Sequence, residues 1–155
     1  MTNQIDEKLK ELNINLPDAA KPAGSYLPVV QTGNLLFVSG QLPLIDGAIT
    51  HKGKVGHDIS VDEGAVAARH CAINILAQVK SHLGGDLARV KRVVKLGGFV
   101  NSLPGFCDHP KVVNGASNLM ADIFGDLGQH ARFAVGASSL PLDVAVEVEA
   151  IIEIA

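Results

Sequence analysis

The last two dozen residues constrain the fold of this chain more than any other stretch. Residues 131–154 contain two β-rich runs separated by a polar break at Pro141. Residues two apart on a strand share a face. One face of the second run is therefore an unbroken apolar row, formed by Val144, Val146, Val148, Ala150, Ile152 and Ile154. The other face mixes glutamates with apolar residues, so we expect one face in the core and the other outside it.

A hairpin is the simplest way to fold these two runs. If the chain turns near Ser139 and Leu140, Arg132 lies opposite Glu147 across the ladder. The pair can then be a surface ion pair worth about 0.2–1 kcal/mol. It can also form an anion site, in which Arg132 binds a carboxylate through two hydrogen bonds and Glu147 holds a water or a nitrogen beside it. Spacing alone leaves both interpretations open.

The N-terminal half predicts a helix followed by strands. Apolar residues at helical spacing, with Thr2 as a cap, indicate a short helix over residues 2–12. A hairpin is expected over residues 27–39, with its turn at Thr32 and Gly33. The next stretch, 42–55, is rich in turn residues and has room for one further strand.

The middle of the chain predicts two longer helices around a strand. Ser60 and Glu63 form a capping box, and the apolar period that follows ends at Gly84-Gly85. Residues 92–101 read as a strand, and a second helix is expected between Asp108 and Gly125. A strand, helix, strand succession implies a crossover with parallel pairing.

The summed element order predicts an α+β fold, with one mixed sheet and two helices packed on one face. The uncovered sheet face is largely apolar, so we expect a second copy of the chain to cover it. Length and composition agree with one ordinary domain, because the chain has 155 residues, 47% of them hydrophobic.

Composition also excludes several function classes. A net charge of −3 argues against a nucleic-acid binder, and the basic cluster Arg89, Lys91, Arg92 and Lys95 is read as a solvated strand end. No stretch is apolar enough for a membrane span, and the N-terminus lacks a secretory pattern. Cys71 and Cys107 are expected to be free thiols, and we expect a cytoplasmic protein. The six histidines lack metal-ligand spacing, and neither a phosphate loop nor Gly-x-Ser-x-Gly occurs.

Two sets of motifs decide between the interpretations of Arg132 and Glu147. The first set is Ala131-Arg132, Leu140-Pro141 and Val146-Glu147-Val148; the second is Ser25-Tyr26, the aliphatic strand 35–38 and Ser39-Gly40-Gln41-Leu42-Pro43. Together they resemble the signature of the RidA (YjgF) family of enamine/imine deaminases. The resemblance covers most of the chain from Pro22 onward. It divides the chain into an N-terminal helical extension, 1–16, and a RidA-like domain, 17–155.

The resemblance implies a chorismate-mutase-like fold and a homotrimer with ligand clefts between subunits. It assigns Arg132 to the substrate carboxylate and Glu147 to the attacking water. It adds the cleft-lining positions Tyr26, Asn114, Ser39, Gly40 and Ala134. Four of these have an ordinary structural alternative: Tyr26 can pack over the sheet edge, Asn114 can be a first-turn helix residue, and Ser39 and Gly40 can be turn residues.

The implied reaction is hydrolysis of small 2-iminoacids, such as 2-aminoacrylate/2-iminopropanoate and 2-iminobutanoate, to 2-oxoacids and ammonia, with no cofactor or metal. An alternative is a non-catalytic sensor that binds a small carboxylate in the same cleft. RNA cleavage, also attached to the family, has little support in this composition. Two departures stand out. His130 replaces a usual proline, and Ala134 replaces a common cysteine, which is tolerable if that position offers only its backbone N–H.

Overall fold

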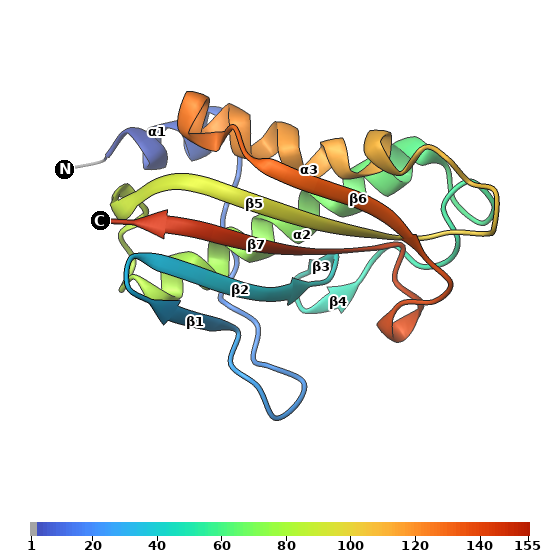
Figure 1. The fold of residues 1–155 in the computed structure, drawn as a ribbon. Coiled ribbons are helices and arrows are strands. Elements are labelled where there is room, and N and C mark those ends of the chain that lie inside the picture. Colours follow the sequence, from blue (N-terminus) through green and yellow to red (C-terminus); the bar gives the residue numbers. More distant parts are fainter. Residues whose placement is uncertain (1–2) are drawn as a thin grey trace.

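A computed structural model describes residues 3–155 and contains a five-stranded mixed sheet with the strand order β1-β2-β7-β5-β6 (Figure 1). The strands are β1 Val29–Thr32, β2 Leu35–Gln41, β5 Val90–Asn101, β6 Ala131–Ala137 and β7 Val146–Ile154. The helices α2 Val61–His82 and α3 His109–Phe124 cover one face of this sheet (Figure 1). The predicted α+β class, with two helices on one face, is therefore confirmed.

The helices begin where the sequence indicated. Ser60 forms the predicted capping box at the start of α2, since its hydroxyl accepts from the backbone N–H of Glu63 and the Glu63 carboxylate accepts from the backbone N–H of Ser60. Asp108 precedes α3 but makes no capping hydrogen bond with its side chain. The N-terminal helix α1 is Gln4–Glu11, capped by Asn3. The predicted cap Thr2 lies outside the described residues.

The last strand supplies the centre of the core. Val146, Val148, Ala150, Ile152 and Ile154 alternate along β7 and are all buried, as the apolar row predicted. They face α2 and α3, whose buried residues include Ile75, Leu76, Leu119 and Met120. Because β7 has a hydrogen-bonded neighbour on each side, both of its edges are protected.

The predicted hairpin between the last two runs is wrong. Strand β5 lies between β6 and β7, parallel to β6 and antiparallel to β7. The physical reason is that α3 carries the chain back along the sheet, so β6 starts beside Lys95 in the middle of β5, runs in the same direction and pairs with it in parallel. A short 3-10 turn, Pro141–Asp143, with positive φ at Leu142 and Asp143, then carries the chain to the other side of β5.

Two shorter segments complete the fold. Within residues 42–55, where one further strand had room, a small hairpin of two strands forms, β3 Leu44–Ile45 and β4 Ala48–Ile49. The thiols of Cys71 and Cys107 are free, as expected. Between residues 3 and 155, no helix combines the length and apolar character that crossing a bilayer requires.

The sheet face opposite the helices carries exposed apolar side chains. Val30, Phe37 and Val135 are 50%, 43% and 43% exposed. On the same face the rings of Phe99 and Phe133 meet edge to face, with their centroids 5.2 Å apart. Exposed aromatic and aliphatic groups spread over several strands are typical of a surface that another chain covers.

Candidate functional site

Arg132 points to the helical side of the sheet. It pairs with Leu96 of β5, which in turn pairs with Ala150 of β7, and both of these residues are buried under the helices. Paired residues in a sheet share a face. The Nη1 atom of Arg132 donates to Asn114 Oδ1 at 2.7 Å and to Ser117 Oγ at 3.1 Å, both on α3. The guanidinium is therefore held against the exposed side of that helix.

His130 extends this network. Its Nε2 lies 2.8 Å from Ser117 Oγ, and its Nδ1 lies 2.6 Å from the carbonyl oxygen of Gly128. A pocket of about 290 Å³ opens beside these groups, lined by Ser117, Asn118, Ala121, Gly128, Gln129, His130 and Arg132. Arg132 is the one permanently charged side chain in this lining, so the pocket favours a small anion.

Ala134 lies on the same face of β6, two residues after Arg132. It pairs with Gly98, which pairs with the buried Val148, and its methyl group packs against the core. We call the group at this edge of the sheet the β6 half-site, formed by Arg132, Asn114, Ala134, Ser117 and His130.

Glu147 points to the opposite face. It pairs with Phe99, which pairs with the exposed Val135. Its carboxylate lies so close to Gly40 that any side chain at position 40 would collide with Oε1. Burial raises the pKa of Glu147, and the negative charge of Glu149 raises it further. Within residues 3–155 no cation forms an ion pair with Glu147.

Ser39 and Gly40 lie beside Glu147, where the pairing of β2 with β7 is irregular between Val38 and Gln41. The Ser39 hydroxyl donates to the backbone oxygen of Leu27 at 2.8 Å. This contact ties β2 to the segment that carries Tyr26, whose side chain is 50% exposed and whose hydroxyl accepts from the N–H of Ala23 at 3.4 Å. We call Glu147, Gly40, Ser39 and Tyr26 the β2–β7 half-site.

The seven predicted site residues thus fall into two groups rather than one. Arg132 and Glu147 lie on opposite faces of the sheet, on strands that β5 separates by about 10 Å. They are also offset by three positions along β5, since Arg132 pairs with Leu96 and Glu147 pairs with Phe99. The expectation that they face each other within one subunit is wrong, because it rested on the hairpin register. What the structure does bring together is Arg132 with Asn114, and Glu147 with Gly40.

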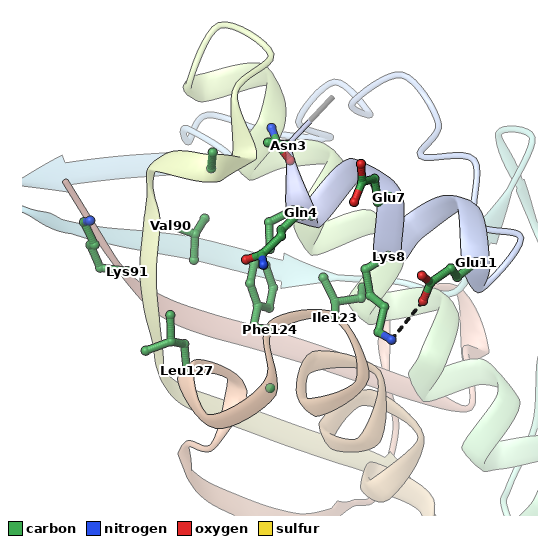
Figure 2. A pocket seen from close by; sticks show the side chains of 13 residues that line it. Asn3, Gln4, Glu7, Lys8, Glu11, Val90, Lys91, Ile123, Phe124 and Leu127 are labelled. Carbon is green, nitrogen blue, oxygen red and sulfur yellow. Dashed lines mark hydrogen bonds and ion pairs between the residues drawn. The ribbon is translucent and has the colours of Figure 1, made fainter. Parts of the chain in front are cut away.

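Other features of the surface contain none of these residues. A pocket of about 760 Å³ lies between α1 and the end of α3, and Figure 2 shows Glu7, Lys8 and Glu11 of α1 on one side and Phe124 and Leu127 on the other. Lys8 and Glu11 pair with each other at 3.0 Å across its rim. In the described residues, no three potential metal ligands gather at one point.

Comparison with known proteins identifies the class. The family model described as "YjgF/chorismate_mutase-like, putative endoribonuclease" matches residues 6–154. The chain belongs to this family, known also as the RidA family, and its chorismate-mutase-like fold is the one expected from the motifs.

Individual relatives support the same placement. Protein TCP17 from Trypanosoma cruzi is 47% identical and covers 99% of this chain and 96% of its own length. The crystal structure of the protein Atu1372 from Agrobacterium tumefaciens is 51% identical, covers 98% of this chain and 93% of its own, and superposes with a TM-score of 0.92. A 2-iminobutanoate/2-iminopropanoate deaminase from Dermatophagoides farinae is 28% identical, with coverage of 91% and 94%.

Ser117 is not among the residues predicted from the sequence, and His130 is noted there only as a departure from the family pattern. A signal for both was present. Ser117 follows Asn114 by three residues on a predicted helix, so the two share a face. His130 precedes Arg132 by two residues, the period at which side chains share a face of a strand.

Proposed function

We propose that this chain is an enamine/imine deaminase that hydrolyses small 2-iminoacids to 2-oxoacids and ammonia in a cleft between two subunits. One observation carries the proposal. The subunit presents a fixed guanidinium at one edge of its sheet and, on the central strand, a partly desolvated carboxylate that pairs with no cation of the described residues. These are the two charges that binding and hydrating a 2-iminoacid require. The deaminase among the relatives supports the chemistry.

The assembly follows from the separation of the half-sites. Because the β6 half-site lies at an edge of the sheet and Glu147 lies on its central strand and on the other face, a complete site takes one half from each of two neighbours. Contacts that join two different surfaces of the same subunit are heterologous, and they close into a ring when the rotation permits. We propose a homotrimer, in which the exposed apolar face around Phe37 and Val135 is covered.

Arg132 is the group that binds the substrate carboxylate. Its Nη1 hydrogens are occupied by Asn114 and Ser117, which leaves Nη2 and Nε free to bind two carboxylate oxygens in parallel. Fixing the carboxylate places the C=N carbon at a set distance from the cleft wall. The pocket of about 290 Å³ beside Arg132 has room for a small substrate.

Glu147 of the neighbouring subunit is the proton carrier. Its carboxylate takes a proton from a water while the water oxygen bonds to the C=N carbon, and it passes this proton to the imine nitrogen, which gives a tetrahedral aminoalcohol. The carboxylate then carries the hydroxyl proton of this intermediate to the amino nitrogen, the C–N bond breaks as the C=O bond forms, and ammonia leaves with a 2-oxoacid as the other product. A raised pKa makes Glu147 a stronger base than an ordinary glutamate, which suits this step near neutral pH. The site needs no cofactor, since an imine is already electrophilic.

The test is a coupled assay. An amino-acid oxidase or dehydratase generates 2-iminobutanoate in solution, and release of 2-oxobutanoate is followed with and without the protein. We expect the protein to accelerate release beyond the rate in water. If wild type does not accelerate release but still binds 2-oxobutanoate, the chain is a carboxylate binder rather than a deaminase.

A further inference from the structure

Ser117 bonds to both Arg132 and His130, and neither Ser117 nor His130 takes part in the proton transfers above. We propose that these two residues are positioning residues of the carboxylate site, which orient the guanidinium of Arg132 through a directional hydrogen-bond relay. The inference rests on the proposed function for its substrate class, but the relay itself stands on the geometry of this chain.

Donor and acceptor chemistry gives these hydrogen bonds their directions when the ring is neutral. A carbonyl oxygen can only accept, so the 2.6 Å contact with Gly128 requires a hydrogen of His130 on Nδ1. In a neutral ring Nε2 is then an acceptor, and Ser117 donates its hydroxyl hydrogen to it at 2.8 Å. With that hydrogen committed, the Ser117 oxygen offers a lone pair to Arg132 Nη1 at 3.1 Å, as the geometry shows.

The relay determines which donors of Arg132 remain available. Nη1 has two hydrogens, and Ser117 and Asn114 accept one each. The guanidinium is planar, so fixing Nη1 at two points also fixes the plane in which Nη2 and Nε lie. These atoms are thereby presented to the pocket in one orientation, and a carboxylate need not order a free arginine side chain on binding.

The use of Ser117 is unusual for a serine inside a helix. Such a hydroxyl commonly bonds back to a carbonyl of the preceding turn. Here it bonds instead to a ring and a guanidinium from outside α3. His130 is likewise tied to Gly128, which is buried under the end of α3. The pocket beside the ring is lined by Ser117, Asn118 and Ala121 of α3 and by Gly128, Gln129 and Arg132, and Arg132 is the one permanently charged side chain in that lining.

The experiment compares matched variants for binding of 2-oxobutanoate and for turnover of 2-iminobutanoate. Ser117→Ala and His130→Phe remove the relay at either end, whereas Ser117→Thr keeps the hydroxyl. We expect KM and the Kd for 2-oxobutanoate to rise about 5- to 30-fold in the first two variants, with a much smaller change in kcat. Ser117→Thr should stay within about twofold of wild type, because its hydroxyl can make both bonds.

A double variant separates a relay from two independent contacts. If the residues act in series, Ser117→Ala combined with His130→Phe weakens binding no more than either change alone. Multiplicative losses, or a loss in kcat with KM unchanged, would overturn the proposal. If a variant loses the oligomer, its binding data are set aside. The comparison is then made with Ser117→Thr, which differs from wild type by one methyl group.

Failure of the relay and failure of the deaminase proposal give different results. If wild type binds 2-oxobutanoate without turning over imines, the deaminase proposal fails and the binding data still decide the relay. If wild type binds no 2-oxobutanoate, crystal structures of wild type and Ser117→Ala decide it. A guanidinium that keeps its position in Ser117→Ala contradicts the positioning role, and one that turns away from Asn114 supports it.

Discussion

The two half-sites of this subunit differ in how their charges are held. At the β6 edge, Arg132 is supported by hydrogen bonds from its own subunit, so it is ordered before anything binds. At the β2–β7 half-site, Glu147 is partly desolvated beside Gly40, with another carboxylate, Glu149, raising its pKa. The β6 half-site has its charge held within one subunit. The β2–β7 half-site holds a carboxylate that a cation from another subunit would stabilise.

In the proposed assembly, two copies of the sheet together build a site that a single copy does not contain. A carboxylate held without a cation costs folding energy in the single subunit. In the proposed shared site, Arg132 of a neighbour would offset part of this cost. If the two half-sites have the roles proposed above, changes at each of them weaken catalysis in different ways.

The largest effect is expected for Arg132→Ala. Loss of the two charged hydrogen bonds to the substrate carboxylate should lower kcat/KM about 100- to 1,000-fold. The loss should come mainly through KM, since these bonds also hold the substrate in its ground state. Arg132→Lys is the matched control, because it keeps the charge but loses the two-point geometry, and we expect it to recover only part of the loss. Steady-state kinetics on oligomer of native size provide the measurement. Unchanged KM in Arg132→Ala would remove Arg132 from the site.

The next largest effect is expected for Glu147→Gln. Replacing the proton carrier by an amide of the same shape should lower kcat about 100-fold and leave the Kd for 2-oxobutanoate nearly unchanged. The same kinetics, with a binding titration beside them, test this split. A loss confined to KM would show that Glu147 binds rather than transfers protons.

The raised pKa of Glu147 also predicts a pH dependence. Activity needs the ionised carboxylate, so it should fall with decreasing pH at a higher pH than an ordinary glutamate would give. For stability the sign is opposite. A carboxyl that holds its proton more tightly when folded favours the folded state at low pH, and this contribution is lost as pH rises through the raised pKa. Thermal melts should therefore show Glu147→Gln gaining a few degrees over wild type near neutral pH and less in acid.

A smaller loss is expected for Gly40→Ala. The added methyl group would meet the end of the Glu147 side chain, which can move aside at little cost to the fold. We expect kcat to fall about tenfold through the displaced carboxylate, with Tm changed only slightly. A crystal structure would show Glu147 shifted. Full activity with a displaced carboxylate would contradict its role.

The smallest effect on activity is expected far from both half-sites, at Ser60→Ala. Loss of the cap on the Glu63 N–H should destabilise the subunit by about 1 kcal/mol and leave kcat/KM unchanged. Denaturant unfolding and kinetics on the same preparation measure both. A large loss of activity here would mean that the losses at the half-sites report general instability.

Sequence predicted the fold well where local patterns decide it. The capping box at Ser60, the helical period of α2 and α3, and the apolar row of β7 all depend on neighbours in the chain, and each was found. The pairing of β6 depends instead on where α3 returns the chain, and a hairpin between β6 and β7 is the shorter connection. Nothing in residues 131–154 alone distinguishes a hairpin from a strand pair with β5 inserted.

The wrong hairpin between β6 and β7 also explains which features of the site the sequence could predict and which it could not. Motifs single out Arg132, Glu147 and Gly40 as candidates one by one, because residue type and order can be read directly from the sequence. Which of them meet is set by register and face, and a change of partner strand moved Arg132 and Glu147 to opposite faces. Ser117 carries no motif at all, and its role becomes visible only when β6 is placed beside α3.

The central claim is that each site takes Arg132 from one subunit and Glu147 from its neighbour, and subunit mixing tests it most directly. Arg132→Ala and Glu147→Gln are each prepared, then unfolded and refolded together in equal amounts. In randomly mixed rings about one quarter of the sites regain both residues, so the mixture should recover roughly a quarter of wild-type activity although each variant alone is nearly inactive. A mixture that exchanges subunits and stays as inactive as its components would contradict the shared site.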